Sequence, residues 1–152
     1  MAELEKEIKT TFTCEKRKLM LNVVYTANWI KNLRADNFVK FGISHQQYNI
    51  LRILRGGHPA QLSMQDIKSR MLEKSPNTTR LTDKLFLRAL IERIRCDKDR
   101  RVVYVGITNK GLEMMNEIDN LSEPLVEKFL NGLDEKKAKM ANELLDSWRD
   151  EI

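Results

Sequence analysis

Residues 63–107 read SMQDIKSRMLEKSPNTTRLTDKLFLRALIERIRCDKDRRVVYVGI, and this stretch decides the fold. Ser63, with Asp66 three residues later, is a helix-capping pair. The Ser75-Pro76 step favours the start of a second helix, because proline at the first helical position loses no hydrogen bond. From about residue 91 the apolar residues alternate as in strands. The stretch therefore predicts two short helices joined by a tight turn, followed by a two-stranded hairpin.

The residues before this stretch predict further helices. Apolar residues recur with a 3.6-residue period up to about Phe41, and Gly42 follows as a helix-ending residue. Ser44 and Gln47 then have the spacing of a capping box, which opens a helix that ends at the Gly56-Gly57 pair.

The residues after the stretch are also expected to be helical. Thr108 is a helix cap, Pro124 interrupts the long apolar stripe that follows, and a last helix begins at Asp134. The fold class predicted is thus mainly α with a small β-hairpin, a helix-turn-helix with a wing between flanking helices.

The charge is distributed unevenly along the chain. The net charge is +5, yet residues 68–101 hold 11 basic against 5 acidic side chains, and residues 112–152 hold 5 basic against 11 acidic ones. A basic middle and an acidic end suggest that one region meets a polyanion. Ordinary solvation of exposed helix faces explains the same pattern about equally well.

Several classes of function are disfavoured by the sequence. The charged residues 1–7 do not form a signal peptide, and no apolar run approaches the roughly 20 residues of a membrane helix. Cys14 and Cys96, like the histidines His45 and His58, lack the spacing of a metal site, and both histidines are expected at the surface. With no nucleophile motif or phosphate-cradling loop either, we expect a cytoplasmic protein that is not an enzyme and has no cofactor or metal.

The second helix of the decisive stretch carries side chains suited to DNA. In a helix-turn-helix, the N-terminal residues of this helix meet base edges in the major groove. Asn and Arg suit adenine and guanine edges, and Thr offers a hydroxyl and a methyl group. The predicted contacts from this helix are Ser75, Asn77, Thr78, Thr79, Arg80 and Lys84. The hairpin loop adds Lys98, Asp99, Arg100 and Arg101, of which the basic residues suit phosphates or a narrow minor groove and the aspartate would orient an arginine.

In this order of motifs the sequence resembles the multiple-antibiotic-resistance regulator (MarR) family of bacterial transcription factors. The resemblance runs from about Ile43 to Leu112 and rests on ISHQQY at 43–48, TRLTDKL at 79–85, LIER at 90–93 and DRR at 99–101, followed by Ile107-Thr108 and Gly111. It implies a single domain over residues 1–152, in which about 43–111 form the DNA-binding lobe and about 1–41 and 112–152 form dimerisation helices. It also implies a cytoplasmic homodimer, usually a repressor, on a pseudo-palindromic operator in double-stranded DNA.

One residue departs from the family pattern. The family usually has glycine before the segment that resembles LIER, and this chain has Ala89. A glycine there ends the helix in a left-handed conformation, which costs alanine about 1 kcal/mol. We therefore expect the helix to run slightly further or to end differently here, which affects the placement of the wing and not the fold.

Regulation is the least determined part of this interpretation. The resemblance implies a small phenolic or aromatic effector between the dimerisation helices and the DNA-binding lobe, and Tyr25, Trp29, Phe38 and Tyr48 are the predicted lining residues. Core and dimer packing explains each of these aromatic residues more simply. Some relatives sense peroxide through a cysteine in the first helix, so Cys14 is an alternative sensor.

A second function class stays open. A winged helix also serves protein–protein interaction, and a basic face would then bind an acidic partner. The Asn-Thr-Thr-Arg helix start at 77–80 and the arginines of the hairpin loop favour DNA.

Overall fold

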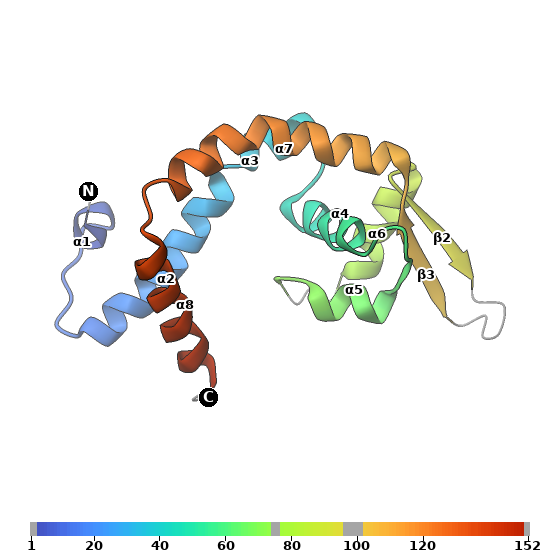
Figure 1. Cartoon of the computed structure of the whole chain (residues 1–152). Helices are drawn as coiled ribbons and strands as arrows, with labels where there is room; N and C mark the ends of the chain where they lie inside the picture. The colour runs from blue at the N-terminus through green and yellow to red at the C-terminus, as the bar shows by residue number, and fades with distance from the viewer. Residues whose placement is uncertain (1–2, 74–76, 96–101, 151–152) are drawn as a thin grey trace.

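The computed structural model describes residues 3–73, 77–95 and 102–150. Figure 1 shows the long helix α7 crossing the top of the molecule between a lobe and a group of helices at the two chain ends. The elements follow one another as α1 (Leu4–Glu7), α2 (Glu15–Asn32), α3 (Ala35–Lys40), α4 (His45–Gly57), β1 (Leu62–Ser63), α5 (Met64–Arg70), α6 (Thr78–Leu87), β2 (Ile91–Arg95), β3 (Val103–Ile107), α7 (Asn109–Leu130) and α8 (Glu135–Asp150).

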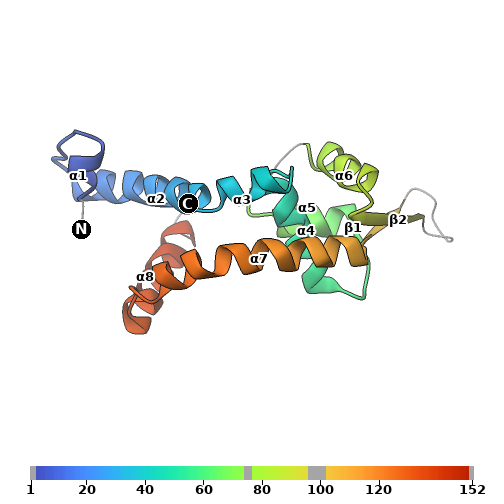
Figure 2. The same ribbon diagram turned by 90° about the horizontal axis from the view of Figure 1, so that it is seen from above.

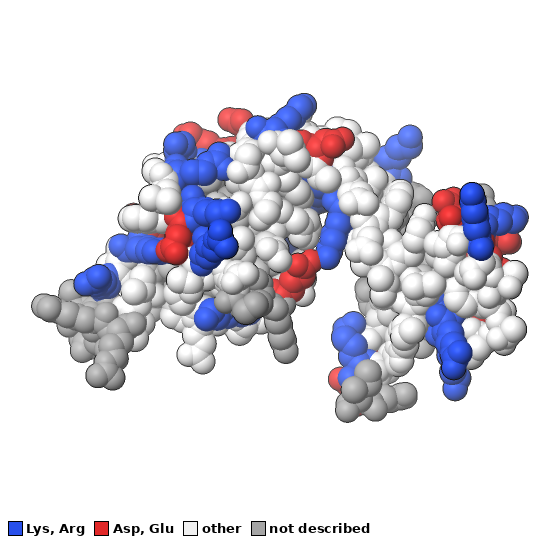
Figure 3. Space-filling model, turned by 180° about the vertical axis from the view of Figure 1, so that it is seen from behind, with Lys and Arg blue, Asp and Glu red and all other residues white. Residues whose placement is uncertain are grey.

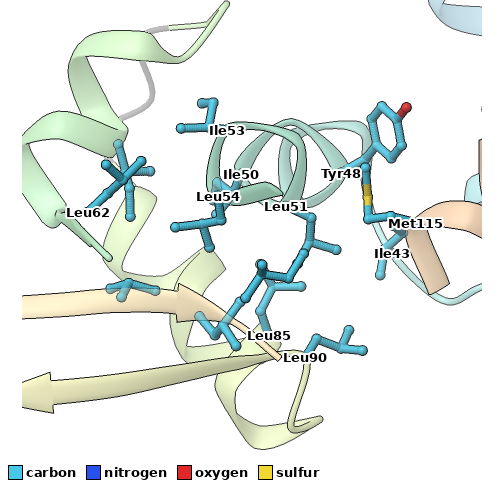
Figure 4. Close-up of a cluster of buried hydrophobic side chains, with 14 of the residues drawn as sticks. Ile43, Tyr48, Ile50, Leu51, Ile53, Leu54, Leu62, Leu85, Leu90 and Met115 are labelled. Carbon is cyan, nitrogen blue, oxygen red and sulfur yellow. The ribbon is translucent and has the colours of Figure 1, made fainter. Parts of the chain in front are cut away.

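The hydrophobic core lies in the lobe formed by α4 to β3, which we call the winged lobe. Leu51, Leu85 and Leu90 are fully buried, and Figure 4 shows their side chains gathered between α4, α6 and the strands. Met115 from the first half of α7 closes the core at the Tyr48 side. The core therefore fixes α6 and the hairpin against α4 and the start of α7.

The sheet has three antiparallel strands, one more than the hairpin that we predicted. In the hairpin, Ile91 pairs with Ile107 and Arg95 with Val103. The added strand β1 pairs Leu62 with Val105 on the other side of β3. Strand β1 is only two residues long, so it shows no alternating pattern in the sequence. Its pairing partner lies about forty residues away along the chain.

Local capping chemistry sets the helix starts, as predicted. The Ser44 hydroxyl accepts a hydrogen bond from the backbone N–H of Gln47, whose side chain accepts one in return from the Ser44 N–H. Ser63 and Asp66 form the second predicted capping box. Thr108 caps α7 by accepting from the N–H of Gly111. Each cap satisfies backbone donors that have no partner within the helix.

The region up to about Phe41 is helical, as predicted, but it is not one continuous helix. The structure has three helices instead, separated at residues 8–14 and 33–34. The first gap contains Thr10, Thr11 and Thr13, and β-branched threonine is a poor helix former. Gly42 follows α3 with φ of 62°, the left-handed conformation expected of a helix-ending glycine.

The second half of α7, together with α2 and α8, forms what we call the helical arm. Pro124, which interrupts the apolar stripe, lies inside α7, and the helix continues through it to Leu130. Neither α2 nor α8 contains a buried residue. Instead the helical arm exposes large apolar side chains, namely Leu19, Met20, Leu21, Val23, Val24, Trp29, Ile30, Leu121, Leu125, Leu130, Met140 and Leu144.

Polar contacts join α7 to the elements beneath it. The Tyr48 hydroxyl donates to an Asp119 carboxylate oxygen at 2.8 Å, and Arg55 donates to the other oxygen at 2.6 Å. Near the middle of α7, the Asn37 amide donates to the buried Ser122 hydroxyl at 3.1 Å. Figure 2 shows α2 and α3 running alongside α7. The three hydrogen bonds thus connect α3 and α4 to α7.

The end of α6 shows how Ala89 replaces the expected glycine. Ala89 has φ of 56°, the left-handed conformation that costs a residue with a Cβ about 1–2 kcal/mol. Its N–H donates to the Phe86 carbonyl at 2.8 Å, and the Leu90 N–H donates to the Leu85 carbonyl at 3.1 Å. These two bonds form a Schellman motif. The helix thus ends where a glycine would end it, so the expectation of a longer or differently ended helix is wrong, and Ala89 carries the strain.

We expect Ala89→Gly to raise the free energy of unfolding by about 1 kcal/mol, because glycine adopts this conformation without a steric cost. Chemical denaturation of both proteins measures the change. Ala141→Gly near the middle of α8 is the matched control and should lower stability by about 1 kcal/mol. Loss of stability in both variants would show that Ala89 is not strained.

Candidate nucleic-acid interface and inter-lobe pocket

Helix α6 begins later than the sequence suggests. The predicted start was Ser75-Pro76; in the structure Asn77 is the N-cap residue and the helix runs from Thr78. Ser75 itself lies outside the described residues. Leu85 and Thr82 are both fully buried, so one face of α6 packs into the winged lobe.

The opposite face of α6 is exposed and basic. Asn77, Thr79, Arg80 and Lys84 are all exposed, and 77, 80 and 84 follow helical spacing along one stripe. Figure 3 shows Lys and Arg side chains gathered over the winged lobe, which is on the left in that view. Four of the residues predicted to contact DNA therefore share one accessible surface.

Thr78 does not belong to that surface. Its side chain is fully buried, and its hydroxyl lies 3.6 Å from the Met71 sulfur. The sequence had predicted Thr78 to be among the DNA contacts. Its position in the structure fits only the packing of α6 against α5.

Arg93 on β2 holds α6 in place, a role that sequence reasoning missed. Its guanidinium donates to the Asp83 carboxylate at 2.6 Å and to the Thr82 hydroxyl at 3.0 Å. It also lies over the Phe86 ring, 5.2 Å from the ring centre. Three residues of α6 therefore contact one side chain of the hairpin, which couples the orientation of the helix to that of the wing.

Arg88, at the end of α6, is also structural. It donates to the carbonyl oxygens of Phe41 and Gly42, both at 2.8 Å. These bonds fasten the end of α6 to the turn before α4. The wing-tip residues Lys98, Asp99, Arg100 and Arg101 lie outside the described residues, and their contacts with DNA remain predictions.

A pocket of about 290 Å³ lies between the helical arm and α4, and we call it the inter-lobe pocket. Figure 3 shows the molecule hollowed between the winged lobe and the end helices. The apolar walls of the pocket come from the end of α2, the end of α7 and the turn after α5, namely Ile30, Leu33, Leu72, Val126, Phe129 and Leu130. Its polar lining is Arg34, His45, Tyr48, Asn49 and Arg52. The four lining residues on α4 have the spacing i, i+3, i+4 and i+7, a pattern visible in the sequence.

The four aromatic residues predicted to bind an effector lie in different places. Tyr48 lines the inter-lobe pocket. Trp29 packs against Phe129 of the pocket wall, with ring centres 5.3 Å apart. Phe38 is buried behind Tyr48, 4.8 Å away between ring centres, and the Tyr25 hydroxyl donates to Glu7. Only one of the four therefore reaches the pocket directly.

The structure also shows the surroundings of His45 and Cys14. His45 is half-buried in the pocket wall, so the expectation of a surface histidine is wrong for it. Burial lowers the pKa of His45, as do the nearby charges of Lys31, Arg34 and Arg52, and Glu73 only partly offsets them. Cys14 is an exposed free cysteine at the N-cap of α2, and its role as a sensor stays a prediction.

The described residues contain neither a candidate membrane span nor a candidate metal site. Across the ranges 3–73, 77–95 and 102–150, no helix combines the length and apolarity that a bilayer crossing requires. Within the described part of the chain, no three His, Cys, Asp or Glu side chains converge on a common point.

Similar proteins share this arrangement. The MarR family model matches residues 43–103. The HTH-type transcriptional regulator MhqR of Bacillus subtilis is 30% identical over 108 residues, which cover 70% of this chain and 72% of that protein. The HTH-type transcriptional regulator PapX of Escherichia coli is 31% identical over 83 residues, and there the chain spans about half (51%) of the relative's length.

Solved structures agree with the sequence matches. A MarR transcription factor from Planctomyces limnophilus is 31% identical, with a TM-score of 0.68 over 91% of this chain and 98% of that one. The S. aureus MepR–DNA complex has a TM-score of 0.75 over 93% of this chain and all of the other, and at 18% identity it shows the fold alone. The motif order, the winged lobe and the likeness to MhqR agree, and the chain belongs to the MarR family of transcriptional regulators.

Proposed function

We propose that this chain binds a specific sequence in double-stranded DNA as a homodimer, with α6 in the major groove. The observation that carries the proposal is the exposed stripe of Asn77, Arg80 and Lys84 on a helix whose other face is buried. Asn and Arg make paired hydrogen bonds to adenine and guanine edges, whereas Lys binds phosphate oxygens. The solved DNA complex of MepR, which has the same fold, supports this use of the winged lobe.

The helical arm supports the dimer. The helices α2, α7 and α8 are long, with 18, 22 and 16 residues, and they carry large apolar side chains that stay exposed. Apolar surface of this extent commonly marks a protein–protein interface. A two-fold dimer through this arm would place two α6 helices on half-sites about one helical turn of DNA apart, which explains why a pseudo-palindrome is expected.

The inter-lobe pocket supports control by a small molecule. It lies between the helical arm, which would hold the dimer, and α4, which packs against α6. Any ligand that changes the angle between these parts would change the spacing of the two α6 helices. We therefore propose that a small aromatic effector in this pocket regulates DNA binding.

Selection from a library of random duplexes, followed by a salt series, tests the DNA proposal. We expect a selected pseudo-palindrome to bind at least about 1,000-fold tighter than its scrambled version, with two chains on each duplex. Affinity should fall steeply with salt, since each phosphate contact contributes about −0.9 to the log–log slope. Sedimentation of the complex measures the stoichiometry.

Two outcomes would contradict the proposal. Equal affinity for selected and scrambled duplexes would mean that the basic face binds phosphate without reading bases. A free chain that sediments as a monomer, together with that result, would favour the alternative of a winged helix that binds an acidic protein.

A further inference from the structure

An open cleft of about 580 Å³ lies between the C-terminal half of α4 and the end of α5, and we call it the α4–α5 cleft. Among the residues that the structure describes, its lining consists of Arg52, Ile53, Arg55 and Gly56 on α4 and of Arg70, the last residue of α5. Three of these five residues are arginines and none is aromatic. The cleft is therefore strongly basic, unlike the mainly apolar inter-lobe pocket.

Most of this positive charge is not neutralised within the described part of the chain. Arg52 and Arg70 are exposed, and neither forms an ion pair with a carboxylate of the described residues. Arg55 donates to Asp119 through one guanidinium nitrogen, Nη1. The carboxylate of Asp66, which lies within electrostatic range of Arg70, is engaged in the N-terminal cap of α5. The three arginines thus keep N–H donors for an anion from outside the chain.

The ends of the two helices explain only part of this cluster. Arg55 and Arg70 lie in the last turns of α4 and α5, where a cation stabilises the partial negative charge of the exposed carbonyl groups. Arg52 lies before the last turn and gains little from this effect. The two helix ends together carry about one negative charge, and Asp119 adds another, so the cluster remains net positive.

Gly56 makes the backbone of α4 accessible in the cleft. It lies in the helix without a positive φ, and a Cβ at this position would have no atom within 4 Å. Neither the backbone conformation nor the available space therefore requires a glycine, although glycine is the least favourable helix residue after proline. The missing side chain leaves room for a ligand beside Arg52 and Arg55.

The cleft faces away from the predicted DNA-binding surface. Arg52, Arg55 and Gly56 have the spacing i, i+3 and i+4, so they share one face of α4. The buried residues Leu51 and Leu54 lie on another face, and Figure 4 shows them on the side of α4 that faces α6 and the strands. Helix α4 therefore lies between the cleft and α6, so a duplex held by α6 is not the expected ligand.

The lining indicates a ligand that carries several phosphate groups. Guanidinium groups form paired hydrogen bonds with phosphate oxygens, and arginines on two helices can each hold a separate phosphate of one chain. A cleft of about 580 Å³ has room for a ligand larger than a single phosphate. Among the described lining residues, no aromatic side chain is present on which a nucleobase could stack.

We propose that the α4–α5 cleft binds a polyphosphate, which is either a free phosphate chain or the phosphate tail of a nucleotide. Arg52 and Arg70 each hold one phosphate group, and the chain passes over Gly56 within reach of the remaining N–H donors of Arg55. The bound ligand joins α4 to α5 and so stabilises the winged lobe. This proposal goes beyond DNA binding and does not depend on it.

Calorimetric titration of the DNA-free protein with tripolyphosphate tests the binding. We expect one saturable site per chain at physiological salt, and orthophosphate should bind at least about tenfold more weakly because it contacts fewer arginines. Similar affinities for tripolyphosphate, ATP and GTP would identify the phosphate chain as the ligand, whereas tighter binding of one triphosphate would identify that nucleotide. No saturable binding of any of the three, or equal binding of orthophosphate, would overturn the proposal.

Arg70→Gln and Arg34→Gln separate the cleft from the inter-lobe pocket. Among the described residues, Arg70 lines only the cleft and Arg34 lines only the inter-lobe pocket, whereas Arg52 lines both. Affinity for tripolyphosphate should fall at least about tenfold in Arg70→Gln and stay unchanged in Arg34→Gln. An Arg70→Gln protein that keeps its affinity, or an Arg34→Gln protein that loses as much, would overturn the proposal.

Gly56→Glu places a carboxylate in the cleft without disturbing the fold, because a Cβ there meets no atom within 4 Å. Binding of tripolyphosphate should be lost, while the melting temperature of the ligand-free protein should not fall. Saturating tripolyphosphate should raise the melting temperature of the wild type and leave that of Gly56→Glu unchanged. An equal rise in both proteins would show that the ligand binds elsewhere on the chain, which would contradict the proposal.

Binding to the selected duplex distinguishes a polyphosphate from the DNA backbone. Arg70→Gln should bind this duplex as tightly as the wild type, because α4 lies between the cleft and α6. A loss of about tenfold or more in DNA affinity would assign the cleft to duplex phosphates and overturn the proposal. If no duplex is ever selected, the proposed function fails, and calorimetry with tripolyphosphate still decides whether the cleft binds a polyphosphate.

Discussion

Replacing Gly111 with alanine is expected to lower the free energy of unfolding by about 3 kcal/mol, one of the largest effects of any single methyl group in this chain. A Cβ at position 111 would lie 2.3 Å from the Leu90 carbonyl oxygen and 2.7 Å from Cγ1 of Ile107. The Leu90 carbonyl has little freedom to retreat, because it accepts from the Thr108 N–H while the Leu90 N–H donates to Leu85. The first turn of α7 must therefore separate from the end of α6. Thermal denaturation should show a loss of about 6–12 °C.

Gly56→Ala provides the matched control for Gly111→Ala. Gly56 also lies in a helix, and a Cβ there would have no atom within 4 Å. Alanine should leave the free energy of unfolding unchanged or raise it by up to about 1 kcal/mol, because glycine is the less favourable helix residue. Equal melting temperatures for the two variants would mean that α7 approaches the end of α6 less closely than the structure shows.

Arg80→Ala is expected to produce the largest single-residue loss of DNA affinity from α6. A well-placed arginine contributes about 1–3 kcal/mol at a guanine edge. The substitution removes one contact from each half of a dimer, so affinity for the selected duplex should fall at least about 30-fold. Arg80 is exposed and lies on the face of α6 opposite the buried Leu85, so stability should change little.

Arg17→Ala on α2 is the control for Arg80→Ala, because it removes the same charge from an exposed residue outside the winged lobe. Binding of both variants to duplexes with single base changes separates two roles. A base contact at Arg80 relaxes specificity at one position of each half-site, whereas a phosphate contact weakens binding to all sequences and flattens the salt dependence. Similar affinities of the Arg80→Ala and Arg17→Ala proteins would remove α6 from the proposed interface.

The parts of the fold that local chemistry determines were predictable from the sequence. The caps at Ser44, Ser63 and Thr108 each involve residues three positions apart, so they are visible in a short window. The left-handed conformation of Ala89 was not predicted, because alanine in place of the family's glycine indicated a longer or differently ended helix. By contrast, β1 forms because Leu62 pairs with Val105, and no local sequence pattern predicts this pairing.

The candidate site also has one part that the sequence predicts and one part that it does not. The exposed stripe of α6 follows from helical periodicity, because burial of Leu85 turns Arg80 and Lys84 outward. The inter-lobe pocket needs α2, α4 and α7 to be placed together, and aromatic character alone selected Trp29, Phe38 and Tyr25, which do not line it. Asn49 gives no signal in the sequence, and only the structure shows that its amide nitrogen is buried without an acceptor among the described residues.

The close join between β3 and α7 has a mechanical consequence. Only Thr108 separates the end of β3 from the start of α7, a helix of 22 residues. Because no flexible linker joins them, we expect the sheet and the helix to move as one rigid unit. At 1.5 Å per residue this lever is about 33 Å long. A rotation of α7 by about 6° about its C-terminal end would displace its N-terminal end, next to the sheet, by about 3.4 Å, the rise of one base pair. In the dimer proposed above, a tilt of a few degrees in the helical arm would thus be enough to shift α6 along the double helix by one base pair.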